Sequence, residues 1–141
     1  MKLKEIDLRN FTFVKSIQSQ GTLTNVKYDG EILTFQTPKI LVHRVVMENN
    51  KKYLFLKLLP TQASEMFKSK ISEIESRFSL HSNFNEDILK VKINDKTRLY
   101  TNTLVNMSLL KEGDIVICLV SFEKIWNNEF YYLVVKEIKV I

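Results

Sequence analysis

The stretch from Gly113 to Ile141 constrains the fold most strongly, because it has the pattern of one long β-hairpin. An apolar arm over residues 115–126 and a second arm over residues 130–141 are both rich in β-branched and aromatic residues, which favour strands. Between them, Asn127 and Asn128 tolerate the left-handed φ of a tight reversal. The first arm is apolar at consecutive positions, so both of its faces must be covered. This predicts a closed or strongly curled sheet with a helix or a partner on its outside.

A second hairpin is predicted around Asp29-Gly30, a pair of residues that suits a type I′ turn. The flanking segments 22–28 and 31–36 alternate as strands do, and Pro38 should end the second strand because it cannot donate to a ladder. The pairs expected across a two-residue loop are Tyr28 with Glu31, Val26 with Leu33, and Thr24 with Phe35.

Residues 40–47 and 52–59 form a third predicted strand pair, and residues 87–93 and 97–101 form a fourth, joined by a loop at 94–96. The residues that this fourth pair would bring opposite each other are Val91 and Leu99, Lys92 and Arg98, and Lys90 and Tyr100. Like charges directly opposed across a ladder are destabilising unless an anion lies on them. The fourth pair therefore predicts a surface that attracts anions.

The hydrophobic period changes after Pro60, where residues 61–79 carry an apolar stripe at helical spacing. The stripe comprises Ala63, Met66, Phe67, Ile71, Ile74 and Phe78. It predicts one amphipathic helix that packs the stripe against the sheet. Residues 3–17 alternate more loosely and predict a strand or an extended arm. Because no repeat or linker-like segment interrupts the chain, residues 1–141 are expected to form a single β-rich domain.

The charge balance is moderately basic, with 21 Lys and Arg against 16 Asp and Glu and a net charge of +5. Such an excess is compatible with a polyanionic partner, and it is also common in proteins that have none. Cys118 is the single cysteine and allows no intramolecular disulfide, which predicts an intracellular, reducing compartment. We expect no secretory signal and no membrane partner, because the first residues lack an apolar run and no segment is long and apolar enough to span a bilayer.

No arrangement of residues in the sequence indicates catalysis. His43 and His81 are far apart and belong to no metal-ligand spacing, and Cys118 lies in an apolar strand where a buried hydrophobe is the expected role. Glycine-rich phosphate loops and nucleophile motifs are missing from the sequence. We therefore expect no enzyme activity, no metal site and no cofactor.

Basic and aromatic side chains are interleaved on the predicted strands, as in proteins that bind single-stranded nucleic acid through a positive groove and stacking rings. The candidate binding residues are Arg44, Tyr53, Lys57, Lys90, Lys92, Arg98, Tyr100 and Trp126. The competing interpretation is structural, because most aromatic residues of a sheet belong to its core and most strand lysines are merely solvated. For Phe55 the sequence favours the core interpretation.

Several segments resemble a small family of proteins from large nucleocytoplasmic DNA viruses. The similar segments are residues 28–39 with their Phe-Gln-Thr-Pro, residues 89–93, residues 113–116, Ile125-Trp126, and residues 136–140. Members of this family are regarded as like single-stranded-DNA-binding proteins and as OB-type barrels. The resemblance implies a barrel with an oligonucleotide groove across its strands, and a role in replication or repair of a viral genome.

Together, the sequence predicts a mostly β fold with one helix, namely an OB-like barrel or curled antiparallel sheet. The predicted function is sequence-nonspecific binding of single-stranded nucleic acid, DNA rather than RNA, in host cytoplasm or at a viral replication site. The alternative is a viral structural or assembly protein that acts through a β-sheet interface, including one between copies of the chain. The apolar end at residues 138–141 would suit pairing with the edge of another chain.

Overall fold

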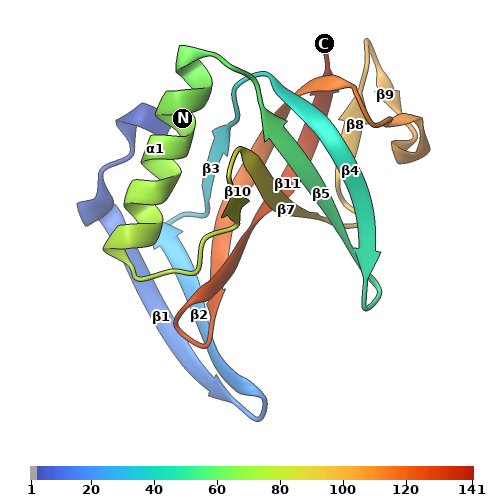
Figure 1. Cartoon of the computed structure of the whole chain (residues 1–141). Helices are drawn as coiled ribbons and strands as arrows, with labels where there is room; N and C mark the ends of the chain where they lie inside the picture. Colours follow the sequence, from blue (N-terminus) through green and yellow to red (C-terminus); the bar gives the residue numbers. More distant parts are fainter. Residues whose placement is uncertain (1–2) are drawn as a thin grey trace.

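The computed structural model describes residues 3–141 and consists of strands wrapped into a ring, with one α-helix beside them (Figure 1). The strands are β1 (Phe11–Gln18), β2 (Gly21–Tyr28), β3 (Leu33–Gln36), β4 (Ile40–Glu48), β5 (Lys51–Leu58), β6 (Phe84–Asn85), β7 (Ile88–Ile93), β8 (Arg98–Tyr100), β9 (Leu104–Val105), β10 (Ile115–Trp126) and β11 (Phe130–Val140). The helices are α1 (Gln62–Arg77) and three 3-10 turns, η1 (Leu3–Glu5), η2 (Leu8–Asn10) and η3 (Met107–Leu109). The predicted mostly β fold with one helix is confirmed.

The ring runs from β4 through β5, β7, β11 and β10 and back to β4. The β7–β11 pair is parallel, whereas the other pairs of the ring are antiparallel. In chain order the first strand of the ring pairs with the fourth and the third with the fifth, which is the five-stranded Greek-key connectivity of an OB barrel. Two seams are short, because β10 pairs with β4 only at residues 115–116 and β11 pairs with β7 only where Val134 lies opposite Lys92, so the barrel is partly open. The parallel pairs of β11 with β7 and β8 correct the expectation of a purely antiparallel sheet.

The predicted β10–β11 hairpin is confirmed, and its two strands pair with most of the other strands of the sheet. Its turn uses Asn127 and Asn128 at φ values of 50 and 64. The other edge of β10 pairs in succession with β4, β3 and β2, so the strand is embedded along its length. Cys118, Phe122 and even Ser121 are at most 1% exposed, as the apolar run predicted.

The core fills the ring, because alternate residues of each strand point inward. The inward-facing set includes Leu54, Leu56, Leu89, Val91, Val116, Val120, Leu133 and Val135, all at most 2% exposed. The predicted helix is confirmed, and its Phe67, Ile71 and Ile74 join this core. Ala63 and Met66 of the predicted stripe are instead exposed. The Thr61 cap turns the first helical residues so that Ser64 faces inward, with its N–H donating to Oγ1 of Thr61 at 3.1 Å.

The hairpin predicted around Asp29-Gly30 is correct at its turn and wrong beyond it. Both turn residues have positive φ, and Tyr28 pairs with Glu31 as expected. Past the turn, β2 pairs with β1, whereas β3 crosses to β10 and ends before Pro38. Val26 therefore lies opposite Phe13, and Leu33 lies opposite Phe122. The turn residues specify the reversal, but the long apolar edge of β10 provides a better partner for β3.

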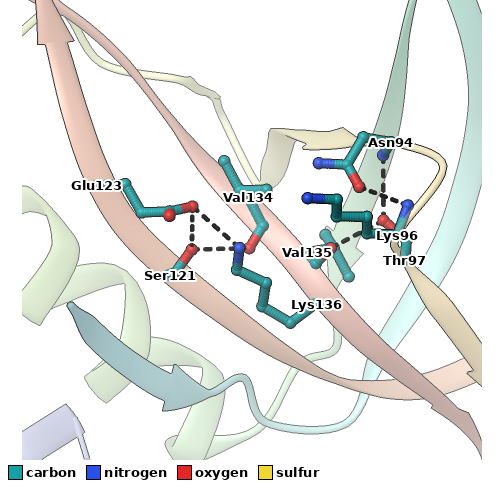
Figure 2. Close-up of polar contacts among 8 residues, drawn as sticks. All are labelled: Asn94, Lys96, Thr97, Ser121, Glu123, Val134, Val135 and Lys136. Atoms are coloured by element: carbon teal, nitrogen blue, oxygen red, sulfur yellow. Dashed lines mark hydrogen bonds and ion pairs between the residues drawn. The ribbon is translucent and has the colours of Figure 1, made fainter.

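The predicted pairing of residues 87–93 with 97–101 is wrong, because β11 lies between β7 and β8. Lys92 is opposite Tyr53 and Val134, whereas Arg98 is aligned with Glu137, so the expected clash of like charges is absent. The crossing is pinned by Thr97, whose hydroxyl donates to the Val135 carbonyl at 2.9 Å and accepts from the Asn94 N–H at 3.1 Å (Figure 2).

Both ends of the chain also differ from expectation. The strand predicted at 3–17 is replaced by η1 and η2 followed by β1, and the β1–β2 hairpin projects beyond the ring (Figure 1). The C-terminal end is not an open edge, because β11 pairs with β10 on one side and with β8 on the other. Ile138 is fully buried there.

Candidate functional site

The outer face of β5 and β7 collects most of the predicted binding residues. Because Leu54 and Leu56 point into the barrel, the intervening Phe55 and its neighbours two residues away point outward. The register places Phe55 opposite Lys90 and Tyr53 opposite Lys92. We call this surface, made of Arg44, Tyr53, Phe55, Lys90, Lys92 and Tyr132, the β5–β7 face.

Lys90 lies at the centre of the β5–β7 face, surrounded by aromatic rings. Its Nζ is 4.3 Å from the ring centroid of Tyr53, 5.6 Å from that of Tyr132 and 5.8 Å from that of Phe55. The Tyr53 and Tyr132 centroids are 5.1 Å apart. On the neighbouring strand, the Arg44 guanidinium carbon lies 5.3 Å from the Phe55 ring. Cations and rings are thus arranged in direct contact, as cation–π interactions require.

Glu48 is the acidic partner of Lys90. Its Oε2 lies 3.2 Å from the lysine Nζ, at a position where the glutamate side chain is 47% exposed. Burial acts to lower the pKa of Lys90, but the hydrogen bond to Glu48 and the electrostatic interactions with Tyr132, Glu48 and Tyr53 together raise that pKa. Lys90 is therefore held as a cation, and its carboxylate partner is accessible enough to be replaced by another anion.

Lys92 has a different electrostatic environment, because its neighbours are cations. Burial lowers the pKa of Lys92, and the positive charges of Lys51 and Lys124 lower it further. Across residues 3–141 no carboxylate forms an ion pair with it. An anion bound beside Lys92 would relieve this repulsion.

A recess of about 510 Å³ adjoins the β5–β7 face. Its aromatic and basic lining residues are Arg44, Phe55, Lys90, Phe84, Phe130, Tyr132, His43 and His81. His43 reaches it because a bulge follows Val42 in β4, and His81 arrives on the loop after α1, with its ring 5.6 Å from that of Phe130. The sequence offered no reason to bring the two histidines together, since each belongs to a different element.

The structure brings most of the predicted binding residues together and leaves Arg98 and Tyr100 apart from them. Arg44, Tyr53, Lys57, Lys90 and Lys92 share the outer side of β4, β5 and β7. Trp126 is 41% exposed at the tip of the last hairpin, opposite Phe130, which lines the recess. Arg98 and Tyr100 are separated from this group because β8 lies across β11 from β7.

Two aromatic residues have roles other than those expected. The Tyr53 ring is only 6% exposed beneath Lys90, so it supports the lysine instead of offering a free stacking surface. Phe55 is partly exposed on the outer face, which corrects its interpretation as a core residue. Tyr132 of this face and Phe130 of the adjoining recess were not among the predicted residues. Alternation with the buried Tyr131 and Leu133 is the signal that would have placed them outside.

A second polar cluster lies where the β10–β11 pair is irregular. The Ser121 hydroxyl donates to Oε2 of Glu123 at 2.7 Å, and the same oxygen is 3.2 Å from Nζ of Lys136 (Figure 2). The ladder shifts between Phe122 and Ile125 and again beside Lys136, so these charged residues sit at β-bulges. Burial acts to raise the pKa of Glu123, but the hydrogen bonds from Ser121 and Lys136 lower it overall.

The Ser121 cluster lacks the features of a nucleophilic site. Ser121 is fully buried, and its hydroxyl donates to a carboxylate that already pairs with a lysine. Burial raises the pKa of the Cys118 thiol to about 12, so the thiolate that reacts is suppressed there as well. Both side chains act in packing and in holding the strands together.

Within residues 3–141, no group of His, Cys, Asp and Glu side chains gathers in a way that could hold a metal ion. The same part of the chain contains no helix that is long and apolar enough to cross a membrane. Comparison with known proteins found no matching family model, curated protein or solved structure.

Proposed function

We propose that this protein binds single-stranded nucleic acid on the β5–β7 face, without sequence preference. The observation that carries the proposal is Lys90 in contact with the rings of Tyr53, Phe55 and Tyr132. Single strands are bound by cations that neutralise phosphates and by rings on which bases stack, and this face supplies both within one surface. The strands involved correspond to the second and third of an OB barrel, where oligonucleotides bind in such folds.

The backbone phosphates would be neutralised by Arg44, Lys90 and Lys92. A phosphate near Lys90 would take the place of Glu48 as its anionic partner. A phosphate near Lys92 would offset the repulsion between that lysine and the cations beside it. Bases would stack on the exposed parts of Phe55, Tyr132 and Phe130, with Trp126 extending the surface past the hairpin tip. Because every base has a π-face, stacking does not select a sequence. The preference for DNA, and service in replication or repair of a viral genome, rest on the resemblance alone.

Fluorescence anisotropy with a labelled oligo-dT tests this proposal, with duplex DNA as the comparison and salt as the variable. We expect binding that favours the single strand and weakens steeply with salt, because counterions are released from each neutralised phosphate. Lys90→Gln should make the dependence of log Kd on log salt concentration less steep, by the amount that corresponds to about one phosphate contact. Tyr132→Leu should weaken binding by about 1–3 kcal/mol, the usual value of one stacked base.

Lys39→Gln provides the matched control, because Lys39 is exposed on the loop between β3 and β4, away from the β5–β7 face. It should bind oligo-dT almost as the unchanged protein does. Equal losses in Lys90→Gln and Lys39→Gln would mean that binding follows net charge only. No binding at low salt would refute the proposed function.

Assembly through a sheet edge remains a second candidate, now carried by β1 instead of the C-terminus. β1 ends the sheet, and its eight residues pair with β2 without a bulge. Val14 is 61% exposed and Ile17 is 91% exposed. An apolar, regular edge can pair with another strand, whereas natural edges are usually interrupted by charges, prolines or bulges. Association that persists at high salt and disappears in Ile17→Lys would favour this candidate.

A further inference from the structure

A second and larger recess, of about 1110 Å³, opens at the end of the barrel away from the helix. It lies between the β4–β5 hairpin on one side and β8, β9 and η3 on the other. We call it the mouth groove. The residues that matter for its chemistry are Val45, Met47, Leu104, Met107, Lys51, Lys52, Lys92, Arg98 and Asp95. The proposed function uses only Lys92 among these residues.

The floor of the mouth groove is aliphatic and unusually exposed. Met47 is 62% exposed, Leu104 is 60% exposed and Val45 is 44% exposed. Among the residues that the structure describes, no phenylalanine, tyrosine or tryptophan lines the groove, whereas four such rings line the recess beside the β5–β7 face. Without rings, the groove offers no stacking surface for bases. Methionine and aliphatic side chains instead suit the apolar side chains of a peptide, to which methionine adapts readily.

The rim of the mouth groove is positively charged. Four of its lining residues are Lys or Arg, and Asp95 is the single acidic one. Arg98 stands on β8 and Lys52 at the start of β5, so the two cations are supplied by different walls. A ligand that lies along the groove would therefore meet positive charge on both sides, which favours an acidic partner.

The wall formed by β4 also has backbone groups available for pairing. β4 is bonded to the β10 side through Ile40 and Leu41 and by the Val42 N–H, which donates to the Asp114 carbonyl at 2.8 Å. From residue 43 to residue 48 its described pairing is with β5 alone. An added strand could satisfy this edge while every second side chain of the ligand points toward the apolar floor.

We propose that the mouth groove binds an extended, acidic peptide segment of another protein, with apolar and acidic residues in alternation. The apolar residues would lie on Met47 and Leu104, and the acidic residues would face Lys52 and Arg98. The groove shares Lys92 with the β5–β7 face but differs from it in every other residue, so one chain could hold a nucleic acid and a protein segment at the same time.

The probe is a fluorescein-labelled ten-residue peptide in which Glu and Leu alternate, added at tracer concentration to the full-length protein and followed by anisotropy. Two comparison peptides replace Leu by Ser or Glu by Lys. We expect saturable binding of the Glu–Leu peptide and markedly weaker binding of both others. The double variant Lys52→Gln with Arg98→Gln should weaken binding about threefold to tenfold, as expected for exposed charge pairs.

Met47→Ser tests the floor separately and, because Met47 is exposed, should leave the fold intact. Met47→Ser should also weaken binding of the Glu–Leu peptide, whereas Lys39→Gln should leave that binding unchanged. Equal binding of the Glu–Leu and Lys–Leu peptides, or no binding of either, would overturn the proposal. So would displacement of the bound peptide by saturating unlabelled oligo-dT, since the groove would then belong to the nucleic-acid path. Peptide binding that survives oligo-dT would support two independent sites.

Discussion

The side chain of Lys90 is held in place by its neighbours on the β5–β7 face. It is held by Glu48 at 3.2 Å and covers the Tyr53 ring at 4.3 Å, so both its charge and its position are defined. A lysine free in solvent would lose rotamer freedom on binding a phosphate, at a cost of up to about 2 kcal/mol. Much of that ordering is already present here, so in the proposed function a phosphate would only have to replace Glu48.

Glu123 carries a prediction about acid stability. Its pKa is lowered from the ordinary value of 4.5 by Ser121 and Lys136, although burial opposes the change. A carboxyl whose folded pKa is depressed adds stability above the pKa of the unfolded chain, and this stability is lost as the pH falls through the folded pKa. The contribution should be below about 1 kcal/mol, because the pair is partly exposed and screened.

Urea unfolding at about pH 5 and about pH 3 measures this effect. Glu123→Gln should lose less stability between the two pH values than the unchanged protein does, because one linked proton has been removed. Glu112→Gln, at an exposed carboxyl on the loop before β10, provides the control. It should lose as much stability between the two pH values as the unchanged protein does. If Glu123→Gln lost as much stability as the unchanged protein, the Ser121 cluster would not contribute to acid stability.

Between elements, the β1–β2 hairpin is joined to the β10–β11 turn by reciprocal hydrogen bonds. The Asn127 N–H donates to the Thr22 carbonyl at 2.8 Å, and the Thr22 N–H donates to Oδ1 of Asn127 at 3.1 Å. Gly21 lies against this joint at a φ of 138, and a Cβ added there would overlap Oδ1 of Asn127. The joint sets the position of the projecting hairpin relative to the barrel.

Gly21→Ala should therefore destabilise the protein by more than backbone strain alone. Gly30→Ala is the matched control, since Gly30 also has a positive φ of 81 but nothing within 4 Å of the added Cβ. Both variants should lose about 1 kcal/mol to strain, and Gly21→Ala should lose about 1–3 kcal/mol more to overpacking. Equal free energies of unfolding for the two variants would contradict the structural role of this joint.

At the same scale, the sequence predicted the elements better than their partners. Turn residues and hydrophobic periods located β4, β5, α1, β10 and β11, because these signals are local. The partners of β3 and β8 were wrong, because a strand next to a turn can pair with any edge that buries its apolar face. β10 and β11 offered longer edges than the neighbouring segments in the chain.

The candidate site was predictable to the same extent. Alternation placed Tyr53 and Lys57 on one face of β5, and Lys90 and Lys92 on one face of β7, but only the pairing of the two strands brings these faces together. The contact of Lys90 with Tyr132 was not predictable, because it depends on β11 lying beside β7 in the ring.

Considered as a whole, the molecule separates two kinds of surface. The outer wall of the barrel combines rings with cations, whereas its mouth combines aliphatic side chains with cations. Basic residues therefore lie on two surfaces that differ in what surrounds the charge. In our account this difference directs nucleic acid to the β5–β7 face and an acidic peptide to the mouth groove.

An NMR titration of the ¹⁵N-labelled protein with oligo-dT at low salt tests the central claim most directly. The account predicts that shifted amide signals concentrate in residues 53–55, 90–92 and 130–132, while those of β1 and η3 stay unchanged. Signals that shift mainly in β8, β9 and η3, or on the β1–β2 hairpin, would contradict the assignment of the β5–β7 face as the binding surface. A spectrum that does not respond to oligo-dT would contradict nucleic-acid binding itself.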